Sequence, residues 1–214
     1  MIEAVIFDMD GVLVDSEHVW DGVRERLARE RGGRWHPGAQ RDMMGMSSPE
    51  WSRYMHETVG LAERPQEINR IVVERMLESY AGGPPWIPGA LDAVRRLGES
   101  FTLGLASSSN REVIDLVLDQ MGVTGCFAAS VSSEEVGRGK PAPDVYLEAA
   151  RRLGVPPDGC TAIEDSENGL RSAHAAGMRV IAIPNPHFPP AEDALALADA
   201  RLPDLDALTP AAVR

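Results

Sequence analysis

Apolar residues change their spacing twice along this chain, and each change predicts a different kind of structure. Residues 2–7 form a short run rich in Ala, Val, Ile and Phe, which is typical of a buried strand. From residue 16 the apolar positions instead recur every three or four residues with charged positions between them, as in amphipathic helices. This pattern predicts helices over about residues 16–31, 39–44, 47–58 and 65–80. Ser16 and Ser47 stand where capping side chains are expected.

Beyond a Gly- and Pro-rich break at residues 82–85, strands and helices alternate. We expect strands over about residues 101–106, 127–131, 160–163, 179–183 and 200–202, with helices over 89–97, 110–121, 144–153 and 167–176. Apolar strands that alternate with helices form a parallel sheet covered by helices on both faces. The predicted fold class is therefore α/β: a Rossmann-like parallel-sheet core of residues 1–15 and 85–214, with an inserted all-helical cap domain of residues 16–84.

Composition and charge narrow the classes of function. The chain has 214 residues, 43% of them hydrophobic, and no apolar stretch of membrane-spanning length. Because its first residues predict a strand, we expect no secretory signal, and its two Cys show neither disulfide-framework nor zinc-site spacing. The net charge of −12 argues against nucleic acid and anionic membranes as partners. We expect a cytoplasmic protein that is a monomer or a weak homodimer.

Two carboxylates follow the first predicted strand, where open α/β sheets bind their ligands. Asp8 is ionised at neutral pH without assistance and could attack phosphorus to form an aspartyl phosphate. Asp10 could protonate the leaving oxygen and then deprotonate the water that hydrolyses this intermediate. Asp10-Gly11 is also a common turn sequence, so an acidic turn without a catalytic role is the alternative.

An acidic protein that binds phosphate needs local positive charge, either from a metal ion or from well-placed cations. Lys140 is the only Lys among the 21 basic residues, and all the others are Arg. A compact ammonium suits both a phosphate oxygen and the carboxylate of Asp8. The alternative is a solitary Lys that lies by chance on a surface loop.

Two further polar clusters follow predicted strands. Residues 107–110, Ser-Ser-Ser-Asn, offer hydroxyls and backbone N–H groups to a phosphoryl oxygen, although such a cluster can also be a simple helix cap. Glu164 and Asp165 would repel Asp8 unless a cation lay among them. Oxygen ligands and a phosphate substrate favour Mg²⁺, whereas acids that complement a helix dipole are the alternative.

Four motifs, in this order, resemble those of the haloacid dehalogenase superfamily. They are Asp8-x-Asp10-Gly11-Val12, Ser107 at a strand end, Gly139-Lys140-Pro141-x-Pro143-Asp144, and Glu164-Asp165-Ser166-x-x-Gly169. The resemblance covers the whole chain. It is strongest to the branch that holds β-phosphoglucomutase and small sugar-phosphate phosphatases, in which a helical cap of the C1 type follows the first motif.

This resemblance implies a role for each motif residue. Asp8 would be the nucleophile, and Asp10 would be the general acid and base. Ser107 and Lys140 would bind the phosphoryl group. The Mg²⁺ ligands would be Asp8, Asp10 through its backbone carbonyl, Glu164 and Asp165.

Two positions separate this chain from the mutases of the same branch. Those mutases have a His on the first cap helix where this chain has Trp20, and an Arg in the cap loop where it has Ser48. Without these groups to hold a bisphosphate intermediate, water is the expected acceptor. In addition, Asp15-Ser16-Glu17-x-x-Trp20 resembles phosphatases of hexose and hexitol phosphates.

The predicted function is therefore a Mg²⁺-dependent phosphatase of small phosphorylated metabolites, in particular sugar or polyol phosphates. The alternative is a hexose phosphate mutase of the β-phosphoglucomutase type. A phosphoacceptor signalling domain would be shorter and have no cap, and a silent binding protein would not need every motif intact. The candidate substrate-binding residues are Glu17, Trp20, Ser47, Ser108 and Asn110.

Overall fold

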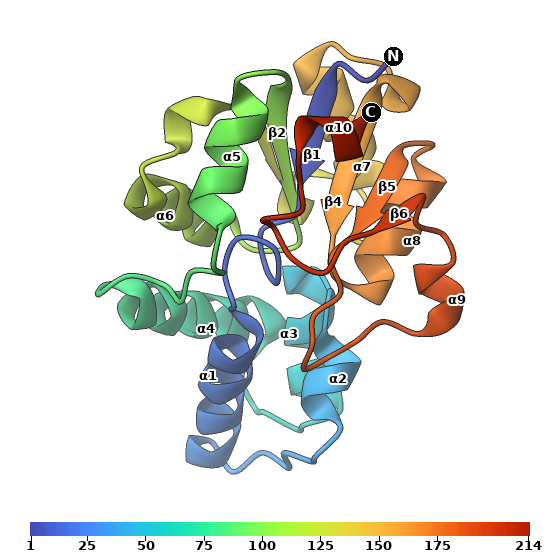
Figure 1. Cartoon of the computed structure of the whole chain (residues 1–214). Coiled ribbons are helices and arrows are strands. Elements are labelled where there is room, and N and C mark those ends of the chain that lie inside the picture. Colours follow the sequence, from blue (N-terminus) through green and yellow to red (C-terminus); the bar gives the residue numbers. More distant parts are fainter.

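Six parallel strands form one sheet at the centre of the computed structural model, which describes residues 1–214 (Figure 1). Their order across the sheet is β3-β2-β1-β4-β5-β6. The strands are β1 (Ala4–Phe7), β2 (Thr102–Ser107), β3 (Phe127–Ser132), β4 (Cys160–Glu164), β5 (Arg179–Ala182) and β6 (Ala200–Arg201). The predicted α/β fold with a parallel sheet is thus confirmed.

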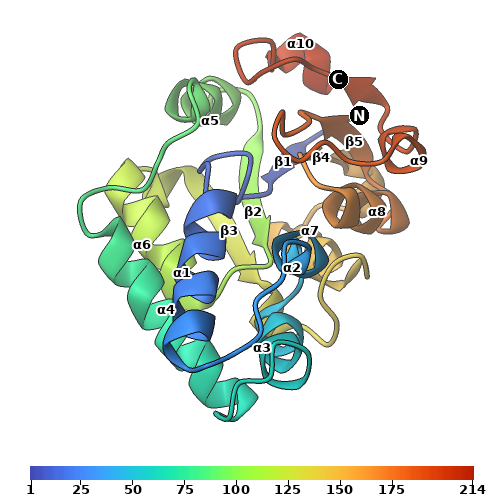
Figure 2. The same ribbon diagram turned by 90° about the horizontal axis from the view of Figure 1, so that it is seen from below.

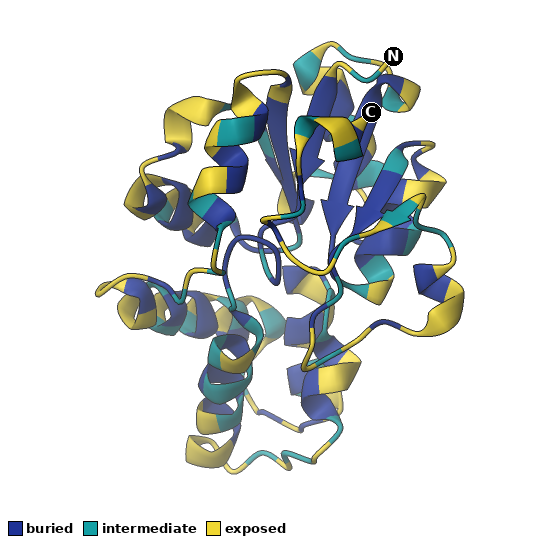
Figure 3. Cartoon of the chain, in the orientation of Figure 1, coloured by how far each residue is buried: buried dark blue, intermediate teal, exposed yellow.

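Helices cover both faces of the sheet, because successive side chains of a strand point to opposite sides and both sides are apolar here. Val5 and Phe7 join the core formed with α5 (Ala90–Gly98) and α6 (Arg111–Met121). Ala4 and Ile6 pack toward α7 (Asp144–Leu153) and α8 (Glu167–Ala175). Figure 3 shows β1, β4 and β5 almost wholly buried between these layers, whereas the edge strand β6 is partly exposed. The continuous apolar runs of the sequence are explained by this burial on two faces.

Four helices between β1 and α5 lie beyond the carboxyl ends of the strands, and Figure 2 shows them from below. They are α1 (Glu17–Glu30), α2 (Ala39–Met43), α3 (Ser48–Glu57) and α4 (Pro65–Tyr80). Helix α4 packs against α1 and α3 and also against α6. One apolar cluster therefore includes side chains of the four inserted helices and of the helices that cover the sheet. The division into a core of residues 1–15 and 85–214 and a cap of residues 16–84 stays a prediction.

The structure differs from the predicted elements at Ser16 and near the C-terminus. Ser16 precedes α1, but its hydroxyl donates to Asp10 Oδ1 at 2.6 Å instead of capping the helix. The helices α9 (Glu192–Leu195) and α10 (Pro210–Val213) were not predicted, because elements this short show no periodicity. Three single 3₁₀ turns complete the chain: η1 (Thr124–Cys126), η2 (Ser133–Glu135) and η3 (Pro157–Gly159). None of the helices combines the length and the apolar character that crossing a membrane requires.

Candidate active site

A tight turn follows β1 and orients the two predicted catalytic carboxylates. The backbone N–H groups of residues 12–14 all donate to the carbonyl oxygen of Met9, at 2.8 to 3.3 Å. Gly11 has a φ of +78°, and a Cβ at this position would lie 1.9 Å from Asp165 Oδ2, so no other residue fits. The turn lies at the carboxyl end of β1 beside β4, where the strand order reverses and where ligands bind in sheets of this kind.

Lys140 is buried beside Asp8. Its Nζ lies 3.0 Å from Asp8 Oδ1 and 2.6 Å from Glu164 Oε1, and only 1% of its side chain is exposed. The hydroxyl of Tyr146 donates to the same Glu164 oxygen at 2.7 Å. Burial alone would lower the pKa of Lys140, but the charges of Asp8 and Glu164 outweigh it and raise that pKa above its ordinary value of 10.5. At neutral pH Lys140 is therefore a charged ammonium.

Three buried carboxylates, those of Asp8, Glu164 and Asp165, offer oxygens that all lie within 4.8 Å of one another. Burial, followed by the charge of Glu164, raises the pKa of both Asp8 and Asp165 well above the ordinary value. Asp165 Oδ1 is fully buried and has no hydrogen-bond partner. Because one ammonium cannot balance this much negative charge, the residues present fit a divalent cation with oxygen ligands. The carboxylate of Asp10 lies outside this cluster, and ligation through its backbone carbonyl stays a prediction.

The carboxylate of Asp10 is oriented by four donors. Its Oδ1 accepts from the hydroxyl of Ser16 at 2.6 Å and from the indole N–H of Trp20 at 3.1 Å. Its Oδ2 accepts from the hydroxyls of Ser109 at 2.7 Å and Ser107 at 3.3 Å. Segments far apart in the chain thus converge on one carboxylate. This convergence explains why the hydroxyl of Ser16 does not cap α1.

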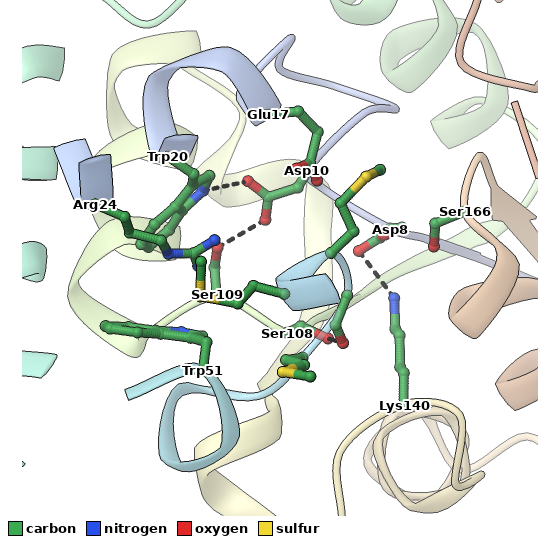
Figure 4. Close-up of a pocket in the computed structure, with 14 residues that line it drawn as sticks. Asp8, Asp10, Glu17, Trp20, Arg24, Trp51, Ser108, Ser109, Lys140 and Ser166 are labelled. Atoms are coloured by element: carbon green, nitrogen blue, oxygen red, sulfur yellow. Dashed lines mark hydrogen bonds and ion pairs between the residues drawn. The ribbon is translucent and has the colours of Figure 1, made fainter. Parts of the chain in front are cut away.

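A pocket lies between the end of the sheet and the helices that follow β1 (Figure 4). Its lining residues are Asp8, Asp10, Glu17, Trp20, Arg24, Met43, Met44, Gly45, Met46, Trp51, Ser108, Ser109, Lys140 and Ser166. The structure brings together here the predicted residues Asp8, Asp10, Glu17, Trp20, Ser108 and Lys140. Glu164 and Asp165 do not line the pocket, and both are buried in the carboxylate cluster that includes Asp8. The motif residues are therefore grouped around one pocket.

Ser47 and Asn110 are not among the lining residues, and their expected role in substrate binding stays a prediction. Ser47 begins α3, where its backbone N–H donates to Glu50 Oε2 at 2.8 Å in a capping box. The amide Nδ2 of Asn110 donates to Asn69 Oδ1 at 3.1 Å and to Glu134 Oε1 at 2.7 Å. Local hydrogen bonds hold both side chains away from the pocket.

Arg24 lines the pocket but was missed as a site residue by sequence reasoning, and Ser109, which also lines it, was predicted only as one of the four residues 107–110. Arg24 is buried, and its guanidinium carbon lies 4.9 Å from the ring centroid of Trp20 and 4.8 Å from that of Trp51. Burial lowers the pKa of Arg24 to about 10. A signal existed, because Arg24 follows Trp20 by one helical turn and so shares its face of α1. Ser109 could not be told from its neighbouring serines by composition.

Glu17 faces the pocket from the start of α1 and is held by Gln40 of α2. The amide Nε2 of Gln40 donates to Glu17 Oε2 at 2.8 Å and to the carbonyl oxygen of the same residue at 3.1 Å. Burial, followed by the charge of Asp10, raises the pKa of Glu17 to about 7. The charge of Glu17 therefore changes near neutral pH.

A parallel sheet with paired aspartates, a buried lysine and a second acidic pair at its strand ends defines a hydrolase of phosphoric monoesters. The chain belongs to the haloacid dehalogenase-like hydrolases, whose family model matches residues 2–177. Its relatives place it in the branch of that family with β-phosphoglucomutase-like structures.

Three similar proteins illustrate this placement. Hexitol phosphatase B of Escherichia coli (strain K12) is 34% identical over an alignment of 227 positions, gaps included, which covers 97% of this chain and 95% of the relative. The crystal structure of a CbbY mutant from Rhodobacter sphaeroides with xylulose-(1,5)bisphosphate has a TM-score of 0.88 at 27% identity, covering 100% of this chain and 99% of that one. β-Phosphoglucomutase from Clostridium difficile shares the fold, with a TM-score of 0.86 at 22% identity over 99% of this chain and 95% of that one.

Proposed function

We propose that this hydrolase is a Mg²⁺-dependent phosphatase of small phosphorylated metabolites, in particular sugar or polyol phosphates, and that it forms an aspartyl phosphate on Asp8. One observation carries the proposal: Asp8 lies at the pocket 3.0 Å from the buried ammonium of Lys140, with the oriented carboxylate of Asp10 lining the same pocket. Two-step phosphoryl transfer requires a nucleophile and a general acid and base that face one substrate. The similarity to hexitol phosphatase B supports the substrate class.

The two carboxylates divide the chemistry between them. In the first step a carboxylate oxygen of Asp8 bonds to phosphorus while the bond from phosphorus to the ester oxygen breaks. Protonated Asp10 gives its proton to that oxygen, and an alcohol leaves. In the second step Asp10 takes a proton from water, whose oxygen attacks phosphorus, so that inorganic phosphate and the Asp8 carboxylate are released. The work of the site is mainly positioning and charge neutralisation.

The phosphoryl oxygens would meet the ammonium of Lys140 and the hydroxyls of Ser108 and Ser109, which line the pocket. Ser107, to which the family resemblance assigns phosphoryl binding, is fully buried. Its hydroxyl accepts from the Ser109 backbone N–H at 3.0 Å and donates to Asp10 Oδ2 at 3.3 Å. We propose that Ser107 positions Asp10 instead.

Asp8, Glu164 and Asp165 would hold the Mg²⁺, together with the backbone carbonyl of Asp10. When bound, the ion neutralises negative charge on the transferring phosphoryl group. The chain supplies a rigid frame for these ligands. Glu164 Oε2 accepts from the backbone N–H of Asp165 at 3.2 Å, and Gly169 lies so close that a Cβ there would fall 1.9 Å from the Glu164 carboxylate.

A hexose phosphate mutase would have to retain a bisphosphate and present its second phosphate to the same site. The two positions that distinguish mutases are otherwise engaged here. The indole N–H of Trp20 donates to Asp10 at 3.1 Å, and the hydroxyl of Ser48 donates to Glu134 at 2.8 Å. Neither offers a cation to a second phosphate, so water is the favoured acceptor. ³¹P NMR that showed an isomerised sugar phosphate in place of free phosphate would support the mutase.

A phosphate-release screen across phosphorylated hexoses, hexitols and smaller metabolites, with and without Mg²⁺, tests the proposal. We expect Mg²⁺-dependent release that Asp8→Asn reduces to below about one thousandth, the scale of a lost nucleophile. Circular dichroism should show that this variant keeps the fold. Asp15→Asn is the matched control, because Asp15 is 47% exposed and lies outside the pocket, and it should behave as wild type. Unchanged release by the Asp8→Asn protein would exclude the mechanism.

A further inference from the structure

Arg24 is buried at the pocket with unused hydrogen-bonding capacity. The residue is 5% exposed, its Nε is fully buried without a partner, and the guanidinium forms no ion pair with a carboxylate. A guanidinium carries five N–H donors, and leaving buried donors unpaired is unfavourable. The rings of Trp20 and Trp51, at 4.9 and 4.8 Å, hold the group through contacts that need no hydrogen bond. The geometry therefore provides donors for an acceptor that does not belong to the chain.

Glu17 provides the complementary acceptor in the same pocket. It precedes Arg24 on α1 by two helical turns and so lies on the same face of the helix. Gln40 donates to Oε2 of Glu17 at 2.8 Å, which leaves Oε1 for a ligand. In Figure 4, Glu17 and Arg24 extend from α1 on one side of the pocket, and Lys140 lies on the other side. Besides the groups assigned to the phosphoryl chemistry, the pocket thus presents one acceptor and one planar set of donors.

We propose that Arg24 and Glu17 bind neighbouring hydroxyl groups at the non-phosphorylated end of the substrate, and that this pair selects polyol monophosphates over substrates with a second anionic group. The inference rests on the proposed phosphatase function. A hydroxyl both donates and accepts, so one diol can accept from Arg24 and donate to Glu17. Arg24 determines specificity in this arrangement, because it contacts the part of the substrate that does not react.

A second phosphate or a carboxylate fits this end of the pocket poorly. Arg24 and Lys140 are the two cationic side chains of the lining, and Lys140 is already paired with Asp8 at 3.0 Å and Glu164 at 2.6 Å. A second phosphate would bring nearly two negative charges to Arg24 beside the carboxylate of Glu17. Neutral hydroxyls avoid this repulsion and still satisfy the donors.

The test compares kcat/KM of wild type, Arg24→Met and Arg24→Lys for a hexitol 6-phosphate, a hexose 1,6-bisphosphate and phenyl phosphate, which has no hydroxyl. Arg24→Met should lower kcat/KM for the hexitol phosphate by a factor at least about tenfold larger than for phenyl phosphate. This is the scale of one charge-assisted hydrogen bond. Arg24→Lys keeps the charge but not the planar donor set, so we expect most of the same selective loss. Wild type should prefer the hexitol monophosphate to the bisphosphate, and Glu17→Gln should reduce that preference.

Arg26→Lys, on the exposed side of α1, is the matched control and should leave every substrate ratio unchanged. Glu17→Gln is isosteric and keeps the test decisive if both Arg24 variants fail to fold by circular dichroism. Equal losses on phenyl and hexitol phosphates in folded Arg24 variants would overturn the inference, as would a wild-type preference for the bisphosphate. An enzyme that does not hydrolyse even phenyl phosphate with Mg²⁺ would instead refute the proposed function, and this inference with it.

Discussion

Replacing Lys140 with Met measures how far the folded state depends on one buried ammonium. Lys140→Met keeps a flexible apolar stem of similar length and removes the charge. Asp8 and Glu164, whose oxygens lie 3.0 and 2.6 Å from Nζ, then lose the cation that they share. Water cannot take its place, because the side chain of Asp8 is 8% exposed and that of Glu164 is not exposed at all.

The structure sets the expected size of this effect. Removing one partner of a buried ion pair typically costs about 3–5 kcal/mol of unfolding free energy. Because Lys140 has two carboxylate partners, we expect a loss near the upper end of that range at neutral pH without divalent cations. In a protein of this size such a loss lowers Tm by about 10–20 °C.

The loss should depend on pH in a defined direction. The carboxylates raise the pKa of Lys140 above 10.5, so the folded state holds this proton more tightly than the unfolded state. The stability that Lys140 contributes is therefore complete below pH 10.5 and declines as the pH rises toward its higher folded pKa. The difference in unfolding free energy between wild type and the variant should become smaller above pH 10.5. It should also narrow in acid, where protonated carboxyl groups need no cation.

Urea denaturation followed by circular dichroism, in the presence of EDTA, measures the unfolding free energy of both proteins. Arg138→Met is the matched control, because this side chain is 71% exposed on the same loop and pairs with Asp144 at the surface. We expect little change in the control, since exposed ion pairs contribute weakly. If the unfolding free energy of Lys140→Met lay within about 1 kcal/mol of the wild-type value at neutral pH, the assignment of Lys140 to a buried ion pair would be refuted.

Two further predictions concern Glu17 and the glycine beside Glu164. Burial raises the pKa of Glu17 from 4.5 to about 7, so its ionisation removes stability as the pH rises through that interval. The urea midpoint of Glu17→Gln should therefore equal that of wild type below pH 4.5 and exceed it above about pH 7. A difference in midpoint that stays the same at every pH would contradict the raised pKa of Glu17. Gly169→Ala would place a Cβ 1.9 Å from the Glu164 carboxylate. We expect it to lower stability by about 1–3 kcal/mol and to weaken Mg²⁺ binding in titration calorimetry. Gly22→Ala, whose Cβ would have no atom within 4 Å, should instead stabilise α1 by about 0.5–1 kcal/mol, so equal effects of the two substitutions would refute the crowding argument.

Much of the fold could be predicted because local periodicity and tertiary environment agree. The helix predicted at residues 65–80 matches α4, since its apolar positions are the ones that the other helices bury. Prediction failed for α9 and α10, which are single turns without an apolar repeat. The strand order could not be predicted either, because the spacing of apolar residues within a strand does not show which other strand pairs with it.

Within the site, residue type predicted some positions but not others. Lys140 could be found because it is unique in composition, and the paired acids because their charges need a counter-ion. At residues 107–109, however, three serine side chains are equivalent in the sequence. Only their packing separates Ser109 at the pocket from Ser107 behind Asp10.

The sequence by itself determined the α/β class and the types of charged group available for chemistry, because both depend on residue identity and local spacing. Tertiary structure alone decided which partners those groups have. It directs Ser16 to Asp10 rather than to its own helix and places Arg24 against two indole rings. It also places the amide of Asn110 where it donates a hydrogen bond to Glu134. Hydrogen bonds and burial depend on which distant segments meet in space, and no local pattern of residues records that meeting.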